Sequence, residues 1–168
     1  MGYLYNDLDM SRIIAKVLYL GMFINIIVPG ALLAGCYLYD QNYPRYNSGG
    51  DFANSLFYIF AVLALIQAGY AIWWRGKKYH QPIARSHETV QEDLAIGLRK
   101  ASQPIFILIA AISGWGYLYF AITGRFKECL MFVMISFIVF QVVRPRYGTM
   151  KKVIDRQLEL LERGKRPD

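Results

Sequence analysis

The chain has 168 residues, which suits a single domain, and 55% of them are apolar whereas 18% are charged. The apolar residues lie in long runs that the charges avoid, so the composition argues against a soluble globular protein. The net charge of +7 would suggest nucleic acid as the partner of a soluble domain. Because the basic residues flank the apolar runs, we expect them to contact lipid headgroups, and we expect no nucleic-acid partner.

Two long apolar runs lie in the first half of the chain. The first covers residues 13–39 and the second covers residues 52–74. Each exceeds the ~20 residues that cross the hydrocarbon core of a bilayer. The loop between them holds Pro44, Asn47 and Gly49, which are typical turn residues. Both runs are therefore predicted to be transmembrane helices.

Two further apolar runs follow a polar segment over residues 75–102. They cover residues 103–123 and 127–143, and a charged tail occupies residues 144–168. None of the four runs has the alternating pattern of a membrane barrel. We therefore predict an all-α integral membrane protein, one membrane domain over residues 1–168, with four transmembrane helices in two hairpins. The alternative arrangement has re-entrant or interfacial segments in place of the third and fourth spans.

The basic residues predict the orientation of these spans. Arg45, Arg125 and Lys127 lie in the two connections on one side, and the rest of the 19 Lys and Arg residues lie on the other side. Lysine and arginine accumulate in cytoplasmic loops. We therefore expect both termini and residues 75–102 on the cytoplasmic side of a bacterial cytoplasmic (inner) membrane.

Short amphipathic helices are predicted in both cytoplasmic segments. Thr89 and Glu92 have the spacing of a capping box, which marks the start of a helix. An apolar stripe follows in each segment, so each helix has one apolar face. We expect these faces either to lie on the membrane surface or to form a docking surface for a partner. The stripes consist of Val90, Leu94 and Leu98, and of Met150, Val153, Ile154, Leu158 and Leu161.

A few polar side chains interrupt the apolar runs and are candidates for a site. Their ordinary role is hydrogen bonding between helices, and the sharper hypothesis is that they line a transport path or bind a substrate. Gln67 and Ser136 lie at matching depth, roughly 10 Å inside the predicted inner boundary at 1.5 Å per residue. We expect both to face the bundle interior and to bond to each other directly or through water. The candidates are Asn25, Gln67, Ser113, Ser136 and Gln141.

Small residues recur four positions apart in three of the runs. This spacing lets helix backbones approach closely. We therefore expect these positions to pack against other helices of a compact bundle or against partner helices. They are Gly30, Ala31, Ala34, Gly35, Ala64, Ala68, Ala110 and Gly114.

The two cysteines and two histidines match no zinc or dithiol redox motif. Leu33 to Cys36 resembles a lipobox, but acidic residues near the N-terminus favour a retained first span over a cleaved signal peptide. Cys36 and Cys129 are expected on the same outer side, where an oxidising compartment allows a disulfide if their Cα atoms lie within about 7 Å. His80 and His87 are more simply exposed loop residues than a shared metal site.

The sequence contains no recognisable enzyme motif, neither a Walker A loop nor GxSxG nor HExxH. We therefore expect a non-enzymatic small subunit, an accessory, scaffold or assembly component of a larger inner-membrane complex. Its expected partners are membrane lipids and other membrane-protein subunits or copies of itself, and no cofactor is expected. A small oligomeric transporter, or the small subunit of a transport system, is the alternative. A lipid-modifying membrane enzyme is the second alternative.

Overall fold

The computed structural model describes residues 10–42, 50–84 and 89–164. Within these ranges all regular elements are helices, and four helical segments are long and apolar enough to cross a membrane. This confirms the prediction of an all-helical chain with four such segments. In chain order the elements are α2 (Met10–Met22), the π-helical η1 (Phe23–Ile27), α3 (Val28–Asn42), α4 (Asp51–His80), α5 (Val90–Thr123), α6 (Phe126–Val143) and α7 (Tyr147–Glu162).

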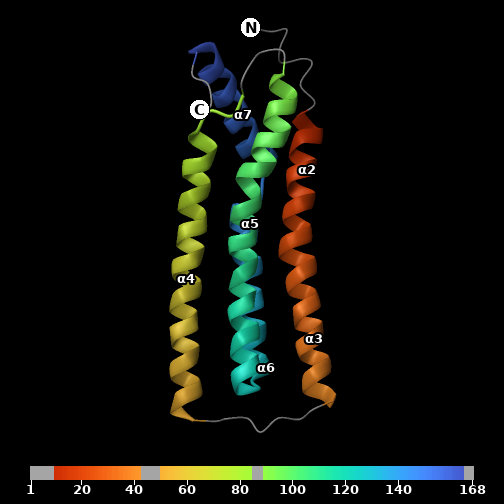
Figure 1. The fold of residues 1–168 in the computed structure, drawn as a ribbon, viewed down its shortest axis with the longest axis vertical. Helices are drawn as coiled ribbons and strands as arrows, with labels where there is room; N and C mark the ends of the chain where they lie inside the picture. The colour runs from red at the N-terminus through yellow and green to blue at the C-terminus, as the bar shows by residue number, and fades with distance from the viewer. Residues whose placement is uncertain (1–9, 43–49, 85–88, 165–168) are drawn as a thin grey trace.

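Helices α5 and α6 form the central antiparallel pair of the bundle (Figure 1). The chain reverses between them at Gly124, whose φ of 72° lies in the left-handed region that favours glycine. Helix α4 packs on one flank of this pair, and the continuous helix α2–η1–α3 packs on the other. The predicted first hairpin is therefore not confirmed, since α3 and α4 pack mainly on the central pair.

Helix α5 passes through the boundary that the sequence predicted between residues 102 and 103. Pro104 lies inside the helix, and an interior proline removes one backbone hydrogen bond and crowds the preceding turn at a cost of about 3 kcal/mol. The buried face nevertheless continues across it, from Leu94 and Leu98 to Ile105 and Ile109. The burial of this continuous face outweighs the proline penalty, so the predicted amphipathic helix of the middle segment is the first part of α5.

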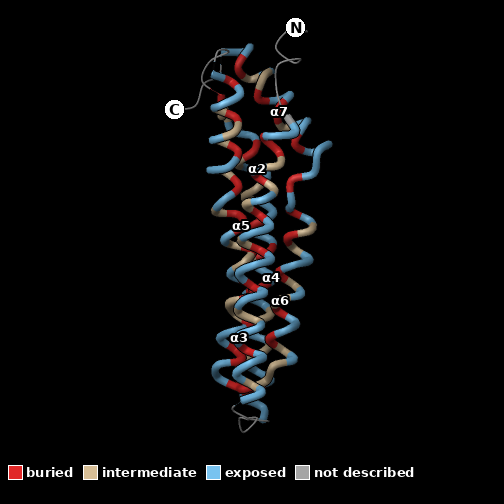
Figure 2. The backbone as a smooth tube through the Cα atoms, turned by 90° about the vertical axis from the view of Figure 1, so that its right-hand side faces the viewer, coloured by how far each residue is buried: buried red, intermediate tan, exposed pale blue. Residues whose placement is uncertain are grey.

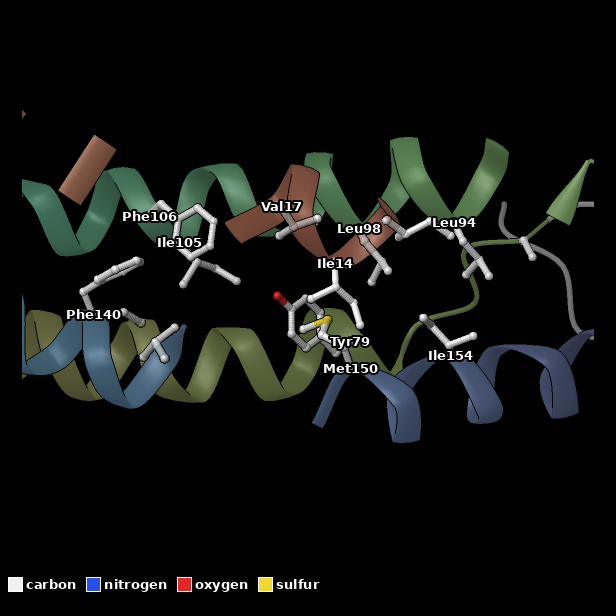
Figure 3. Packing of buried hydrophobic residues seen from close by; sticks show 14 of the residues in the cluster. Ile14, Val17, Tyr79, Leu94, Leu98, Ile105, Phe106, Phe140, Met150 and Ile154 are labelled. Atoms are coloured by element: carbon white, nitrogen blue, oxygen red, sulfur yellow. The ribbon is translucent and has the colours of Figure 1, made fainter. Parts of the chain in front are cut away.

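One end of the molecule, which we call the head, is formed by the start of α2, the end of α4, the start of α5 and all of α7. Side chains from these four elements meet in one apolar core (Figure 3). Ile14 and Val17 come from α2, Tyr79 comes from α4, and Met150 and Ile154 come from α7. Burying an aliphatic side chain of this size contributes about 1.5–3 kcal/mol, so the head is a substantial part of the core.

The head contains both amphipathic faces that the sequence predicted. Their apolar side chains contact one another and α2, so they are covered within the chain. This corrects the expectation that they lie on the membrane surface or form an open docking surface. Val90, Leu94, Leu98, Ile154 and Leu161 are buried, and Val153 and Leu158 pack against the same cluster.

Residues 81–84, which follow α4, are fixed to the head by Gln157 of α7, which is buried. Its Oε1 accepts a hydrogen bond from the Ile83 backbone N–H at 2.8 Å. Its Nε2 donates to the carbonyls of Gln81 at 2.8 Å and Tyr79 at 3.3 Å. A buried amide that satisfies three backbone groups stabilises a loop that has no helical hydrogen bonds of its own.

Away from the head, the long helices leave much of their apolar surface uncovered. Most residues of α3 and α4 outside their contacts with α5 and α6 are exposed (Figure 2). Helix α5 is the most buried of the four long segments, as its central position requires. Large exposed side chains on the outer faces include Phe23, Ile27, Tyr58, Leu65, Ile66 and Ile138.

Candidate functional site

Two of the predicted polar positions, Gln67 and Ser136, meet the backbone of α5 at consecutive residues. The Nε2 of Gln67 donates to the Leu108 carbonyl at 2.6 Å, and the Ser136 hydroxyl donates to the Ile109 carbonyl at 2.8 Å. The Oε1 of Gln67 also accepts a hydrogen bond from the Trp115 indole N–H at 2.8 Å. These contacts join α4 and α6 to the same turn of α5.

The structure therefore gives Gln67 and Ser136 a shared neighbour. Both side chains face α5; Ser136 is buried and Gln67 is half-buried. Each donates its hydrogen bond to the α5 backbone instead of to the other side chain. A helix carbonyl keeps a second lone pair after its intrahelical bond, so α5 can accept these donors without losing its own hydrogen bonds. The arrangement clamps three helices together.

The other candidate polar residues lie apart from this clamp or make bonds within their own helix. The Ser113 hydroxyl donates to the Ala110 carbonyl of its own helix at 2.5 Å. Gln141 is half-buried near the end of α6, where its backbone carbonyl accepts a hydrogen bond from Arg146 at 3.4 Å. The structure therefore does not bring the five predicted residues into one polar site.

Asn25 differs from the rest because its hydrogen bonding is incomplete. It lies in the π-helical segment η1 and is buried, and its Nδ2 donates to the Gly21 carbonyl at 3.1 Å. Its Oδ1 is the one buried side-chain polar atom without a partner in the described part of the chain. Single π-helical turns occur frequently at functional sites. Asn25 can accept a hydrogen bond from one further donor.

The small residues fall into three groups by burial. Ala64 and Ala68 of α4 are buried in a cluster with Ile112 and Phe132. Ala110 and Gly114 are half-buried, and the four small residues of α3 are exposed. All three predicted packing glycines, Gly30, Gly35 and Gly114, are open: an added Cβ would meet no atom of the described residues within 4 Å.

Gly116 and Gly21 are two of the glycines outside the predicted set that make close contacts. A Cβ at Gly116 of α5 would lie 2.7 Å from the Phe132 Cβ and 2.9 Å from the Cys129 carbonyl oxygen, both on α6. A Cβ at Gly21 would lie 2.9 Å from the Phe106 ring. Neither glycine has a small residue four positions away, so the spacing rule gave no signal for them.

The two cysteines lie in one buried cluster with Phe120, at the end of the bundle opposite the head. Cys36 comes from α3 and Cys129 from the first turns of α6, and their side chains interact with each other. Both are free thiols in the structure. Phe126 packs against the cluster, with its ring 6.3 Å from the Phe120 ring and 5.8 Å from that of Tyr37.

An apolar groove of about 320 Å³ runs between α3 and α5 beside the cysteine cluster. Its α3 wall includes two of the predicted small residues, Ala31 and Gly35, together with Cys36. Its α5 wall includes Tyr117 and Phe120. The small residues of α3 therefore leave a hollow in the surface where larger side chains would fill the space.

The histidines do not form a site in the described residues. His80 is exposed at the end of α4, where its Nδ1 is 2.5 Å from the Gly76 carbonyl oxygen. His87 lies outside the described residues. In residues 10–42, 50–84 and 89–164, no three side chains of His, Cys, Asp or Glu come together in a group that would hold a metal ion.

Comparison with protein-family models, curated proteins and solved structures found no match for this chain. Function is therefore inferred from features of the residues themselves. These are the clamp at Gln67 and Ser136, the unpartnered oxygen of Asn25, the cysteine cluster with its groove, and the uncovered faces of the long helices.

Proposed function

We propose that this chain is a multi-pass membrane protein that serves as a non-enzymatic accessory, scaffold or assembly subunit of a larger membrane complex. The proposal rests mainly on the partners of the polar side chains in the long helices. Gln67, Ser113 and Ser136 donate to backbone carbonyls within the chain. A transport path needs polar groups that are free to exchange partners with a substrate, and these residues are already bonded to the fold.

The outer faces of the long helices support insertion in a bilayer. Monomeric soluble proteins rarely expose contiguous apolar patches larger than a few hundred Å², whereas the outer faces of α3 and α4 are apolar over most of their length. An aromatic and basic band lies on α4 near the head: the Lys77 amine is 5.4 Å from the Trp73 ring centroid, and Trp74 follows. Such a band is typical of the boundary between lipid and water.

The head is proposed to lie on the cytoplasmic side of a bacterial inner membrane, because most basic residues flank that end. Reporter fusions at Gly49 and at the C-terminus test the orientation. Alkaline phosphatase should be active at Gly49, and a fluorescent protein should be fluorescent at the C-terminus. The reverse pattern contradicts the orientation.

The exposed stripe of Gly30, Ala31, Ala34 and Gly35 supports a partner helix on α3. In the described part of the chain, no atom lies within 4 Å of a Cβ added at Gly30 or Gly35. In lipid, where the hydrophobic effect does not drive helix association, small residues allow the close backbone contact that holds two helices together. We propose that this face of α3 packs against a helix of another subunit.

Site-specific photo-cross-linking in native membranes tests the proposed role. A photoreactive residue at Ala34 should give one discrete adduct with a different protein, while the same residue at Leu65, on the exposed face of α4, serves as a control for random collisions. An adduct with the mass of two copies of this chain would favour the oligomeric transporter instead. Equal, diffuse labelling from both positions would contradict the subunit proposal.

The unpartnered side-chain oxygen of Asn25 favours the transport alternative. Its Oδ1 is buried and has no partner among the described residues. This oxygen is therefore free to accept a hydrogen bond from a substrate. Under the subunit proposal, replacing Asn25 by leucine leaves assembly unchanged. Under the transport alternative, the same replacement abolishes activity while the protein still assembles.

A further inference from the structure

We propose that Cys36 and Cys129 are a redox-active pair that forms a reversible disulfide between α3 and α6. The pairing chemistry is independent of the proposed subunit role, and only the compartment of the reaction depends on the proposed orientation. The bond would join the first long helix to the last one at the end of the bundle opposite the head.

The first support is the convergence of the only two cysteines in the chain. They come from different helices that are far apart in sequence, yet both are buried, at 2% and 1% exposure, in the same small cluster and interact with each other. Disulfide formation needs two sulfurs that approach without backbone rearrangement. Helices α3 and α6 pack together, and both cysteines lie in one cluster, so the bond would join two helices that are already in contact.

The second support is the close packing that holds Cys129 in place. Gly116 lets α5 approach the backbone of Cys129, because a Cβ there would lie 2.9 Å from the Cys129 carbonyl oxygen. On the side of Cys36, the Tyr39 and Phe120 rings lie 6.4 Å apart, edge to face. Packing from both sides limits how far either thiol can move from the other.

The third support is the groove between α3 and α5, which is lined by one of the two cysteines and not by the other. Cys36 lines this groove together with Gly35 and Tyr39, whereas Cys129 is not among its lining residues. In the isolated chain, where no partner helix covers Ala31 and Gly35, a small reagent that enters the groove reaches Cys36 first. Cys129 then lies behind it, in the position of a resolving thiol.

The reaction is a thiol–disulfide exchange in two steps, with a small disulfide compound as the oxidant. The Cys36 thiolate attacks one sulfur of the oxidant, the oxidant's sulfur–sulfur bond breaks, and the leaving thiolate takes up the proton that Cys36 released. The Cys129 thiolate then attacks the Cys36 sulfur of the mixed disulfide, and the second half of the oxidant leaves as a thiol. Two protein thiols become one disulfide, and the oxidant becomes two thiols.

The test uses the full-length protein in mild detergent, with oxidised glutathione as the oxidant. After treatment, the protein is denatured and labelled with a maleimide polymer that shifts its mobility on a gel once for each free thiol. We expect two shifts before oxidation, none after it in a monomeric band, and two again after dithiothreitol. Mass spectrometry should identify a cross-linked peptide pair that contains Cys36 and Cys129.

The single variants test the order of attack. In Cys129→Ser, glutathione should add to Cys36 and remain there as a mixed disulfide. In Cys36→Ser, glutathione should add to Cys129 at least tenfold more slowly, because the groove does not expose it. Equal rates in the two variants contradict the assignment of Cys36 as the attacking thiol.

Two results would overturn the pair itself. One is that both thiols of the folded wild type still react with the polymer after prolonged oxidation. The other is that oxidation yields only cross-linked dimers. The cross-link from Ala34 is measured on cysteine-free protein, so a failure of the redox pair and a failure of the subunit proposal are distinguishable.

Discussion

Gly116 is a position at which a single methyl group should disturb the contact between α5 and α6 directly. In Gly116→Ala the new Cβ would lie 2.7 Å from the Phe132 Cβ and 2.9 Å from the Cys129 carbonyl oxygen. Neither contact is with the tip of a flexible side chain, so a rotamer change cannot relieve it. Helix α6 must move away from α5, and overpacking of this kind costs about 1–3 kcal/mol.

A matched control lies two residues away on the same helix. A Cβ at Gly114 would meet no atom within 4 Å. Both substitutions gain helix propensity, since alanine is favoured over glycine by about 1 kcal/mol in a helix interior. That gain cancels in the comparison, so we expect Gly116→Ala to be less stable than Gly114→Ala by about 1–3 kcal/mol. Gly114→Ala itself should match or exceed the wild type.

The free energy of unfolding is measurable by titrating detergent-solubilised protein with sodium dodecyl sulfate and following helix content. The comparison should use the midpoint and slope of each transition, because a changed slope indicates a changed reference state rather than a changed stability. Oxidation of the cysteine pair should also slow in Gly116→Ala, since α6 carries Cys129. Equal stability of the two alanine variants would refute the close approach of α5 and α6 at Gly116.

Three further predictions concern buried polar groups. In a double-mutant cycle, Gln67→Leu and Trp115→Phe should be coupled by about 0.6 kcal/mol and by no more than about 1.7 kcal/mol, and strictly additive costs would exclude the hydrogen bond between them. Gln157→Leu should destabilise the head by about 1–3 kcal/mol and speed hydrogen exchange at the Ile83 amide. Glu159→Gln on the same helix breaks only an exposed ion pair with Arg163 and should change stability by less than about 1 kcal/mol, so similar effects of these two variants would contradict the role of Gln157. Asn25→Leu should leave the free energy of unfolding unchanged or raise it, because it removes a buried acceptor that has no partner; a marked loss of stability would mean that Oδ1 has a partner after all.

Hydropathy predicted the long helices well because it reports a local property of the chain. The fourth run, predicted at residues 127–143, is α6 at Phe126–Val143. Polar residues on either side of the run mark both ends of this helix. The third run was predicted to begin after Ser102, yet α5 begins at Val90. The partners that extend it, Tyr79 and the core of the head, are distant in sequence and invisible to a local pattern.

The apolar stripes and polar candidates show the same limit. The periodicity of Leu94, Leu98, Ile154 and Leu161 correctly indicated helices with one apolar face, but periodicity does not say what covers that face. Here both stripes are covered within the core of the head, together with side chains of α2 and α4. Likewise, the depth of Gln67 was enough to predict a side chain that avoids lipid, whereas its bonds to Leu108 and Trp115 depend on how α4 rotates against α5.

The π-helical turn sets the rotational phase of the first long helix. Val17 and Cys36 both face inward and are 19 positions apart in the sequence, whereas five turns of a regular α-helix take about 18 residues. The π-helical stretch Phe23–Ile27 accommodates the extra residue. The inward-facing side of α3 therefore stays aligned with that of α2. Loss of one residue inside this stretch would leave a regular α-helix with Cys36 still directed at Cys129. Loss of one residue between Pro29 and Cys36 would turn the cysteine away by about 100°, the rotation per residue of an α-helix.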